Sequence, residues 1–174
     1  NFWDKLETID DDAFKDCIFD KFVLPNTLEI IGKSSFAECK NLHNIEIPIT
    51  VYSIGEGAFS SSSLITINLP RKLKKISKYT FYWCSLLSEI KIPKNVEVIE
   101  DYAFYNCDSL KELIIPENVK SIGNNADDYF YNREHYKNYS TNYINTENNY
   151  EKYWKNQEID KNIYSVEPAV TGEA

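Results

Sequence analysis

The chain has 174 residues, a net charge of −8 and a pI near 4.8, with four cysteines and no methionine. Nucleic-acid affinity depends on Lys and Arg side chains that neutralise phosphates, so we expect no nucleic-acid partner. No apolar run approaches the roughly 20 residues of a membrane-spanning helix, and we expect no transmembrane segment.

The dominant feature is an internal repeat marked by prolines 22 or 23 residues apart. Self-similarity at this period is typical of a solenoid. Residues upstream of the first of these prolines fit the same apolar columns, with Trp3 in the proline position. We therefore expect one repeat domain over residues 1–123. The five prolines are Pro25, Pro48, Pro70, Pro93 and Pro116.

Each unit contains about eight apolar residues, too few for a separate core, so stacked copies must bury one another. The end of the unit, as in Leu42, Ile45 and Ile47, follows the strand period of two. Its copies are expected to pair as a short parallel sheet, about 4.8 Å apart. We interpret the Ile-Gly pair, as in Ile54-Gly55, as a corner where glycine permits positive φ. Residues 33–39 leave room for one turn only.

The string Ile-Pro-x-x-Val-x-x-Ile-Gly-x-x-Ala-Phe-x-x-Cys-x-x-Leu is clearest in residues 48–70 and 93–115. It resembles the BspA-type class of leucine-rich repeats, and the resemblance covers residues 3 to about 123. The resemblance implies an α/β-type solenoid, a right-handed curved horseshoe with a parallel concave sheet and brief turns or 3₁₀ segments on its convex side. It also implies a cell-surface or secreted protein that acts in adhesion or host contact.

The cysteines occupy one column of the repeat, in which Ser62 takes the place of a fifth. Adjacent coils would place Cys17 near Cys39 and Cys84 near Cys107, within reach of a disulfide. Buried free thiols are favoured, because free cysteine is among the most buried residue types, but disulfides stay open. A zinc-knuckle spacing is absent, and we expect no metal and no cofactor.

The sequence offers no catalytic constellation. His43 falls at a strand entrance without a paired nucleophile, and His135 lies outside the repeats. The run of residues 10–12, all aspartate, lacks the glycine and distal glutamate of a calcium loop, and we interpret it as a solvated acidic turn. We expect the protein not to be an enzyme.

Strand residues that alternate with the buried ones should point outward on the concave face. Concave solenoid faces are extended binding surfaces, so this stripe is the first candidate site, for a protein or a cell-surface ligand. Its apolar ends, Val23 and Ile114, are either exposed or covered by caps. The ten residues are Lys21, Val23, Asn44, Glu46, Thr66, Asn68, Glu89, Lys91, Glu112 and Ile114.

A second candidate site is an aromatic corner formed by Tyr82, Trp83 and Tyr105, which stand where other units have mostly small residues. Exposed Tyr and Trp anchor interfaces, although these side chains alternatively pack against the C-terminal segment. A basic cluster in the same unit is interpreted as a solvated edge rather than a site for an acidic partner. It consists of Arg71, Lys72, Lys74, Lys75 and Lys78.

The repeat fails after Gly123, because Asp127 stands where the template requires phenylalanine. We expect residues 124–174, rich in Asn and Tyr, to form a cap or a linker. The main functional hypothesis is a non-catalytic binding module. The alternative is a structural spacer or assembly subunit whose C-terminal segment makes the contacts, and the oligomeric state stays open.

Overall fold

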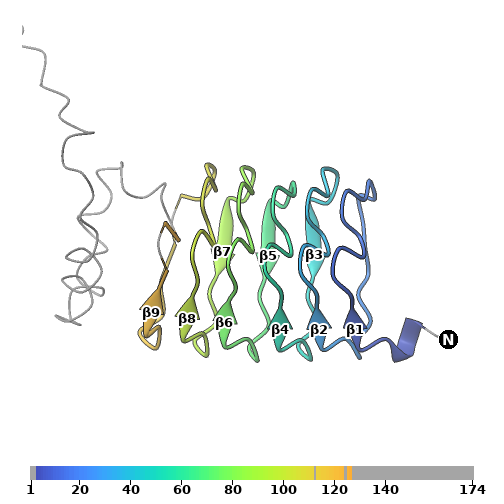
Figure 1. Ribbon diagram of the computed structural model, residues 1–174, viewed down its shortest axis with the longest axis horizontal. Coiled ribbons are helices and arrows are strands. Elements are labelled where there is room, and N and C mark those ends of the chain that lie inside the picture. The colour runs from blue at the N-terminus through green and yellow to red at the C-terminus, as the bar shows by residue number, and fades with distance from the viewer. Residues whose placement is uncertain (1–2, 112, 124, 127–174) are drawn as a thin grey trace, which may run out of the picture. The chain divides into compact units, whose positions relative to one another are not determined.

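The computed structural model describes residues 3–111, 113–123 and 125–126. They form a parallel-strand β-solenoid whose coils stack along one axis (Figure 1). We number the coils by residues: coil 1 is 3–24, coil 2 is 25–47, coil 3 is 48–69, coil 4 is 70–92 and coil 5 is 93–115. Within the described residues the helical content is one 3₁₀ turn, Trp3–Lys5, and the expected one-turn connections at residues 33–39 are present as turns.

The expected parallel sheet is formed by coils 2, 3 and 4, midway along the stack. It consists of β3 (Asn44–Glu46), β5 (Thr66–Asn68) and β7 (Glu89–Lys91), paired in that order. Each strand has one buried residue between two exposed ones, as the period of two predicts. We call it the central sheet.

The strand ladder is shorter than the sequence predicts, because residues 21–23 and 113–114 are not strands. In coil 1, Phe22 occupies the column that Ile45 fills in coil 2. Its ring packs against Phe14 and Phe36, with centroids 4.6 and 5.6 Å apart. We attribute the loss of pairing in coil 1 to this larger side chain. Glu112 lies outside the described residues.

A second row of two-residue strands lies at the expected Ile-Gly corner. The strands form two parallel sheets, in the orders β1-β2-β4 and β6-β8-β9. The sequence indicated a corner here but no strands, because a segment of two residues is too short to show an alternating pattern. Their bounds are β1 Thr8–Ile9, β2 Ile30–Ile31, β4 Ser53–Ile54, β6 Lys75–Ile76, β8 Val98–Ile99 and β9 Ser121–Ile122.

The glycines at this corner do not have the expected positive φ; among the described glycines, positive φ occurs at Gly57. Their role is close approach between coils. A Cβ on Gly55 would lie 2.6 Å from the Lys33 nitrogen, and one on Gly32 would lie 2.6 Å from the Asp10 carbonyl carbon. Any side chain larger than hydrogen would push these coils apart.

The core consists of ladders of identical side chains. The fully buried rings of Phe36, Phe59, Phe81 and Phe104 stack nearly parallel, with successive centroids 5.6, 5.8 and 5.4 Å apart. Each ring therefore contacts the copies before and after it, which explains why a single unit cannot be stable alone.

All four cysteines are free, which confirms the free-thiol interpretation, but Cys17 is only partly buried. The thiols of Cys39, Cys84 and Cys107 are buried, and each donates a hydrogen bond to a phenylalanine carbonyl of a preceding coil, 3.1 to 3.2 Å away. Burial raises the pKa of Cys84 to about 11. These thiols are structural, because the thiolate required for nucleophilic or metal chemistry is disfavoured.

Candidate binding surface

Six side chains of the central sheet point away from the core and are exposed to solvent. They alternate with the buried Ile45, Ile67 and Ile90, so the same alternation that builds the core builds this surface. Strand register places them in two rows along the solenoid axis. We call this surface the central-sheet face; its rows are Asn44-Thr66-Glu89 and Glu46-Asn68-Lys91.

The second row carries opposite charges at its two ends. Glu46 and Lys91 are two strand spacings apart, about 10 Å, which is too far for an ion pair. Among the residues that the structure describes, neither side chain has a hydrogen-bond or ion-pair partner. Both charges are therefore available to a ligand.

The first row is fixed by one side-chain contact. The Thr66 hydroxyl donates a 2.9 Å hydrogen bond to the Asn44 side-chain oxygen. This bond uses the Asn44 oxygen, so the Asn44 NH₂ group is left to face outward. The amide oxygen and nitrogen are distinguished here by the hydrogen-bond network.

By the repeat period, the Glu46 row continues to Val23 in coil 1 and Ile114 in coil 5. Their exposed fractions are 80% and 64%, so the described residues leave both ends exposed. Lys21, at the end of the first row, is exposed as well. From coil 1 to coil 5, the side chains of the second row are thus apolar, acidic, amide, basic and apolar.

The aromatic corner is larger than the sequence indicated. Tyr82 and Tyr105 stack at 5.4 Å, and beside them Tyr79 and Tyr102 stack at 5.2 Å. Edge contacts join Tyr79 to Tyr82 and Tyr102 to Tyr105 at 5.2 and 5.6 Å, so the four rings form a two-by-two grid. Trp83, half-exposed, adjoins Tyr82 at 6.3 Å. Tyr79 and Tyr102 share one column three residues before the predicted tyrosines, which was the signal available in the sequence.

Three residues of this corner have left-handed backbone: Tyr79, Trp83 and Tyr102, with φ of 57°, 58° and 56°. Bulky residues in this region are uncommon. Positive φ nevertheless recurs in the same two columns of the other coils, as at Ser34 and Glu38, so the repeat imposes this conformation. Other coils fill the same columns with smaller side chains, for example Gly57 and Ser61. The aromatic residues are therefore not required by the coil geometry.

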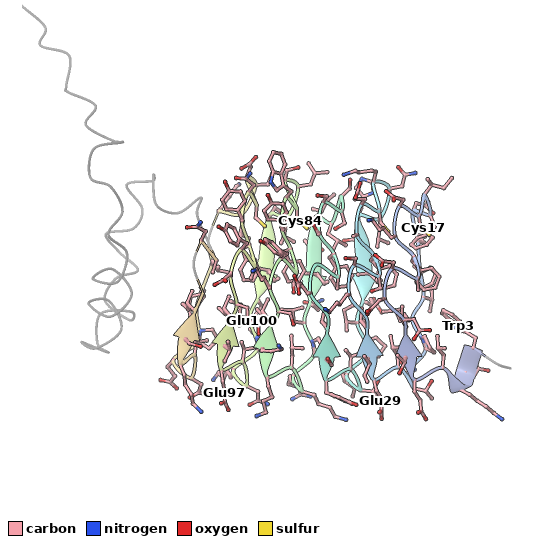
Figure 2. All side chains as sticks on the ribbon, in the orientation of Figure 1. Trp3, Cys17, Glu29, Cys84, Glu97 and Glu100 are labelled. Carbon is pink, nitrogen blue, oxygen red and sulfur yellow. The ribbon has the colours of Figure 1, made fainter. Side chains whose placement is uncertain are left out.

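The basic cluster of coil 4 is largely paired with coil 5. Lys75 contacts Glu100 at 2.8 Å, and Lys78 lies 3.9 Å from Asp101. Glu97 is contacted by Lys74 and, at 2.6 Å, by Lys120, whose hydrogen bond lowers the pKa of that carboxyl. Glu97 and Glu100, labelled in Figure 2, flank β8. This pairing supports the interpretation of the cluster as a solvated edge.

The histidine and acidic residues singled out in the sequence form no metal-binding group in the described part of the chain. His43 is exposed, with Nδ1 2.8 Å from the Asn41 carbonyl oxygen, and His135 lies outside the described residues. Within those residues, no group of three or more His, Cys, Asp or Glu side chains has a geometry suited to a metal ion. None of the helical segments in that part of the chain is long and apolar enough to cross a membrane.

Stacked parallel coils with laddered Leu, Ile and Phe define a leucine-rich-repeat solenoid. A sequence model described as "BspA type Leucine rich repeat region" matches residues 7–137 in six copies, and the chain belongs to this family. The family is a repeat fold that serves interactions.

Solved bacterial structures show the same fold. A leucine-rich cell surface protein from Faecalibacterium prausnitzii is 27% identical, with a TM-score of 0.57 over 62% of this chain and 32% of that one. A leucine-rich repeat protein of T. pallidum is 27% identical, with a TM-score of 0.58 over 68% of this chain and 67% of that one. One from Eubacterium ventriosum is 23% identical, with a TM-score of 0.60 over 71% of this chain and 40% of that one.

This chain therefore spans about a third of the length of the Faecalibacterium protein. No curated protein matches the sequence.

Proposed function

We propose that this chain is a non-catalytic interaction module that binds a protein or a surface ligand through the central-sheet face. The observation that carries the proposal is the pair Glu46 and Lys91, two opposite charges held on the outer strands of a rigid sheet without partners in the described part of the chain. Charges presented in fixed positions select a partner by complementarity and speed its association.

The sheet itself favours binding. The backbone of β3, β5 and β7 is fixed by pairing on a fully buried core, so little backbone freedom is lost when a ligand docks. In our proposal the module belongs to a cell-surface or secreted protein, with a role in adhesion or host contact. The family and the Faecalibacterium relative described as a cell surface protein support this assignment.

The experiment is affinity capture from cell-surface and host extracts with the full chain immobilised. The face variant carries Glu46→Lys and Lys91→Glu. A matched control carries Glu29→Lys and Lys94→Glu, which make the same exchange of charges at exposed positions outside the central sheet; Glu29 directly precedes β2 (Figure 2). The proposal expects partners that the control retains and the face variant loses. Equal capture by all three proteins contradicts it.

The aromatic corner is a second candidate surface, favoured by its grid of four tyrosine rings and the half-exposed Trp83 beside it. Trp83→Ser introduces a residue that coil 3 already carries in this column as Ser61, so the fold should persist. Loss of partners with Trp83→Ser alone would support the corner. Capture that survives both the face and the corner variants would favour the assembly role, with contacts in residues 124–174, which we propose as a cap or linker beside a solenoid of residues 1–123.

A further inference from the structure

We propose that the central-sheet face docks on a second copy of itself, forming a two-fold dimer centred on coil 3 with the solenoid axes antiparallel. The proposal rests on the proposed function in that it uses the same face, and it names a second copy of this chain as one partner. A closed two-fold interface requires a self-complementary surface, in which residue i of one copy meets j of the other and j meets i.

The Glu46 row has this property. A two-fold axis parallel to the strands and passing through coil 3 places coil 2 of one copy opposite coil 4 of the other. Glu46 then faces Lys91 of the second copy, and Lys91 faces its Glu46, so two ion pairs form across the axis. Asn68, on the axis, faces its own equivalent, and a side-chain amide both donates and accepts hydrogen bonds.

The same operation places coil 1 opposite coil 5. Val23 then faces Ile114 of the second copy, and the two exposed apolar ends of the row cover each other at both edges of the interface. Their exposed fractions of 80% and 64% in the single chain would fall together. Contact between these side chains in the dimer explains why two apolar side chains are exposed in the single chain.

The other row is compatible with this arrangement. Thr66 faces its equivalent near the axis, and Asn44 faces Glu89 of the second copy. Because the Asn44 oxygen already accepts the Thr66 hydroxyl at 2.9 Å, the Asn44 NH₂ donors are the group that meets the Glu89 carboxylate.

The alternative two-fold axis, along the solenoid, is less complementary. It places each coil opposite the same coil of the second copy and exchanges the rows. Lys91 would still meet a carboxylate, that of Glu89, but Lys21 would face Val23 and Glu46 would face Asn44. The alternation of charge along the Glu46 row therefore selects the antiparallel dimer.

The surface involved is small, so the dimer should be weak, with a Kd on the order of 10 μM to 1 mM. Its two ion pairs lie near solvent, where salt screens charges more than about 8 Å apart at physiological ionic strength and weakens closer pairs. Association should accordingly decrease as salt is raised.

The test is sedimentation equilibrium of the full chain up to about 1 mM, in low salt, for five samples. Wild type should dimerise, and Glu46→Lys and Lys91→Glu alone should each associate at least tenfold more weakly, because like charges then face each other. The double variant should recover dimerisation. An equimolar mixture of the two single variants should recover it as a heterodimer, because each then supplies the charge that the other lacks.

Asn68→Arg provides a second variant that depends on the axis itself, because each added charge meets its own copy. It should abolish dimerisation, and mixing it with Asn68→Asp should restore association. These substitutions are at exposed positions, and thermal melts of each variant verify folding.

A monomeric wild type at about 1 mM overturns the dimer, as do single variants that associate like wild type or a double variant that fails to recover. The proposed function fails differently. It predicts that the double variant loses its foreign partner in the capture experiment, whereas the dimer predicts that the same variant keeps self-association. A monomeric wild type whose partner is lost on the double exchange leaves the proposed function standing and removes the dimer alone.

Discussion

Small side chains at the Ile-Gly corner determine how closely the coils approach. Gly55 has ordinary backbone geometry but faces the preceding coil, where a Cβ would lie 2.6 Å from a backbone nitrogen. Gly57, two residues later, has φ of 62°, and a Cβ there would meet no atom closer than 3.5 Å. Gly55 is thus required by contact with the preceding coil, whereas at Gly57 only the backbone conformation favours glycine, and Ser34 and Tyr79 adopt the same conformation in the same column with φ of 48° and 57°.

Gly55→Ala should therefore destabilise the protein more than Gly57→Ala. Overpacking against backbone costs about 1–3 kcal/mol or more, and a non-glycine residue in the left-handed region costs about 1–2 kcal/mol. We expect Gly55→Ala near the upper end and Gly57→Ala near the lower end of these ranges, measured by urea unfolding. Equal effects would show that the close approach of coils 2 and 3 is not rigid.

The buried thiols predict a loss of stability in alkali. Burial raises the pKa of Cys84 to about 11 in the folded state, above its ordinary value of 9.0. Below pH 9 the Cys84 thiol keeps its proton in both the folded and the unfolded state, so its contribution to the free energy of unfolding does not change with pH. Between pH 9 and 11 the unfolded state ionises first, so the free energy of unfolding falls by about 1.4 kcal/mol per pH unit for this thiol.

Cys84→Ser should remove that part of the pH dependence. Ser62 already fills the same buried column in coil 3, so the variant has a precedent within the fold. Urea unfolding of both proteins at pH 8, 9, 10 and 11 measures the slopes. Parallel slopes would mean that Cys84 ionises as readily when folded as when unfolded.

At the scale of elements, the interruption between β4 and β6 divides the second row of strands into two sheets. In coils 2 and 3 the glycine N–H donates to an isoleucine carbonyl of the coil before, as Gly55 does to Ile31 at 2.8 Å. At the equivalent place in coil 4, the Ser77 hydroxyl donates to the Ile54 carbonyl at 2.7 Å. Glu100 occupies the equivalent position in coil 5, and its N–H donates to the Ile76 carbonyl at 2.9 Å. A side chain at this position therefore does not by itself prevent pairing between coils.

The short hydroxyl of Ser77 thus takes the acceptor that its own N–H would otherwise use, as serine often does near backbone. We expect the Ser77 amide to exchange with deuterium roughly tenfold or more faster than the Gly55 amide, measured by NMR. In Ser77→Ala the amide should become protected, as at Glu100. A Ser77 amide as slow as Gly55 in the native protein would rule out this account of the interruption.

Much of this architecture could be predicted from the sequence, because each coil repeats the same apolar columns. The central sheet and the Phe36 to Phe104 ladder follow from period and stacking. The second row of strands could not be predicted, since a two-residue strand such as Val98–Ile99 carries no alternation. Nor does a sequence reveal whether a glycine such as Gly55 is needed for its φ or for a neighbour's approach.

The candidate surfaces divide in the same way. Alternation was enough to place Glu46, Asn68 and Lys91 outward on one row. That Glu46 and Lys91 have no partner in the described chain, while Lys75 is paired with Glu100, depends on distances between coils. The four-tyrosine grid likewise required the geometry, because Tyr79 and Tyr102 share their column with small residues.

At the scale of the whole molecule, described coils 1 to 5 act as one scaffold. Many of its charges outside the central sheet in coils 4 and 5 are paired. Three of its four thiols, those of Cys39, Cys84 and Cys107, are buried and donate to phenylalanine carbonyls. In the described part of the chain, the central-sheet face combines a rigid backbone with unpaired opposite charges. We propose binding through that face as the function of the molecule.

The most direct test is the capture experiment with wild type, the Glu46→Lys/Lys91→Glu variant and the Glu29→Lys/Lys94→Glu control, compared by quantitative mass spectrometry of the bound proteins. We expect a set of partners that wild type and control retain and that the face variant reduces at least tenfold, because reversing two charges at an interface turns attraction into repulsion. Partners bound equally by all three proteins would contradict it.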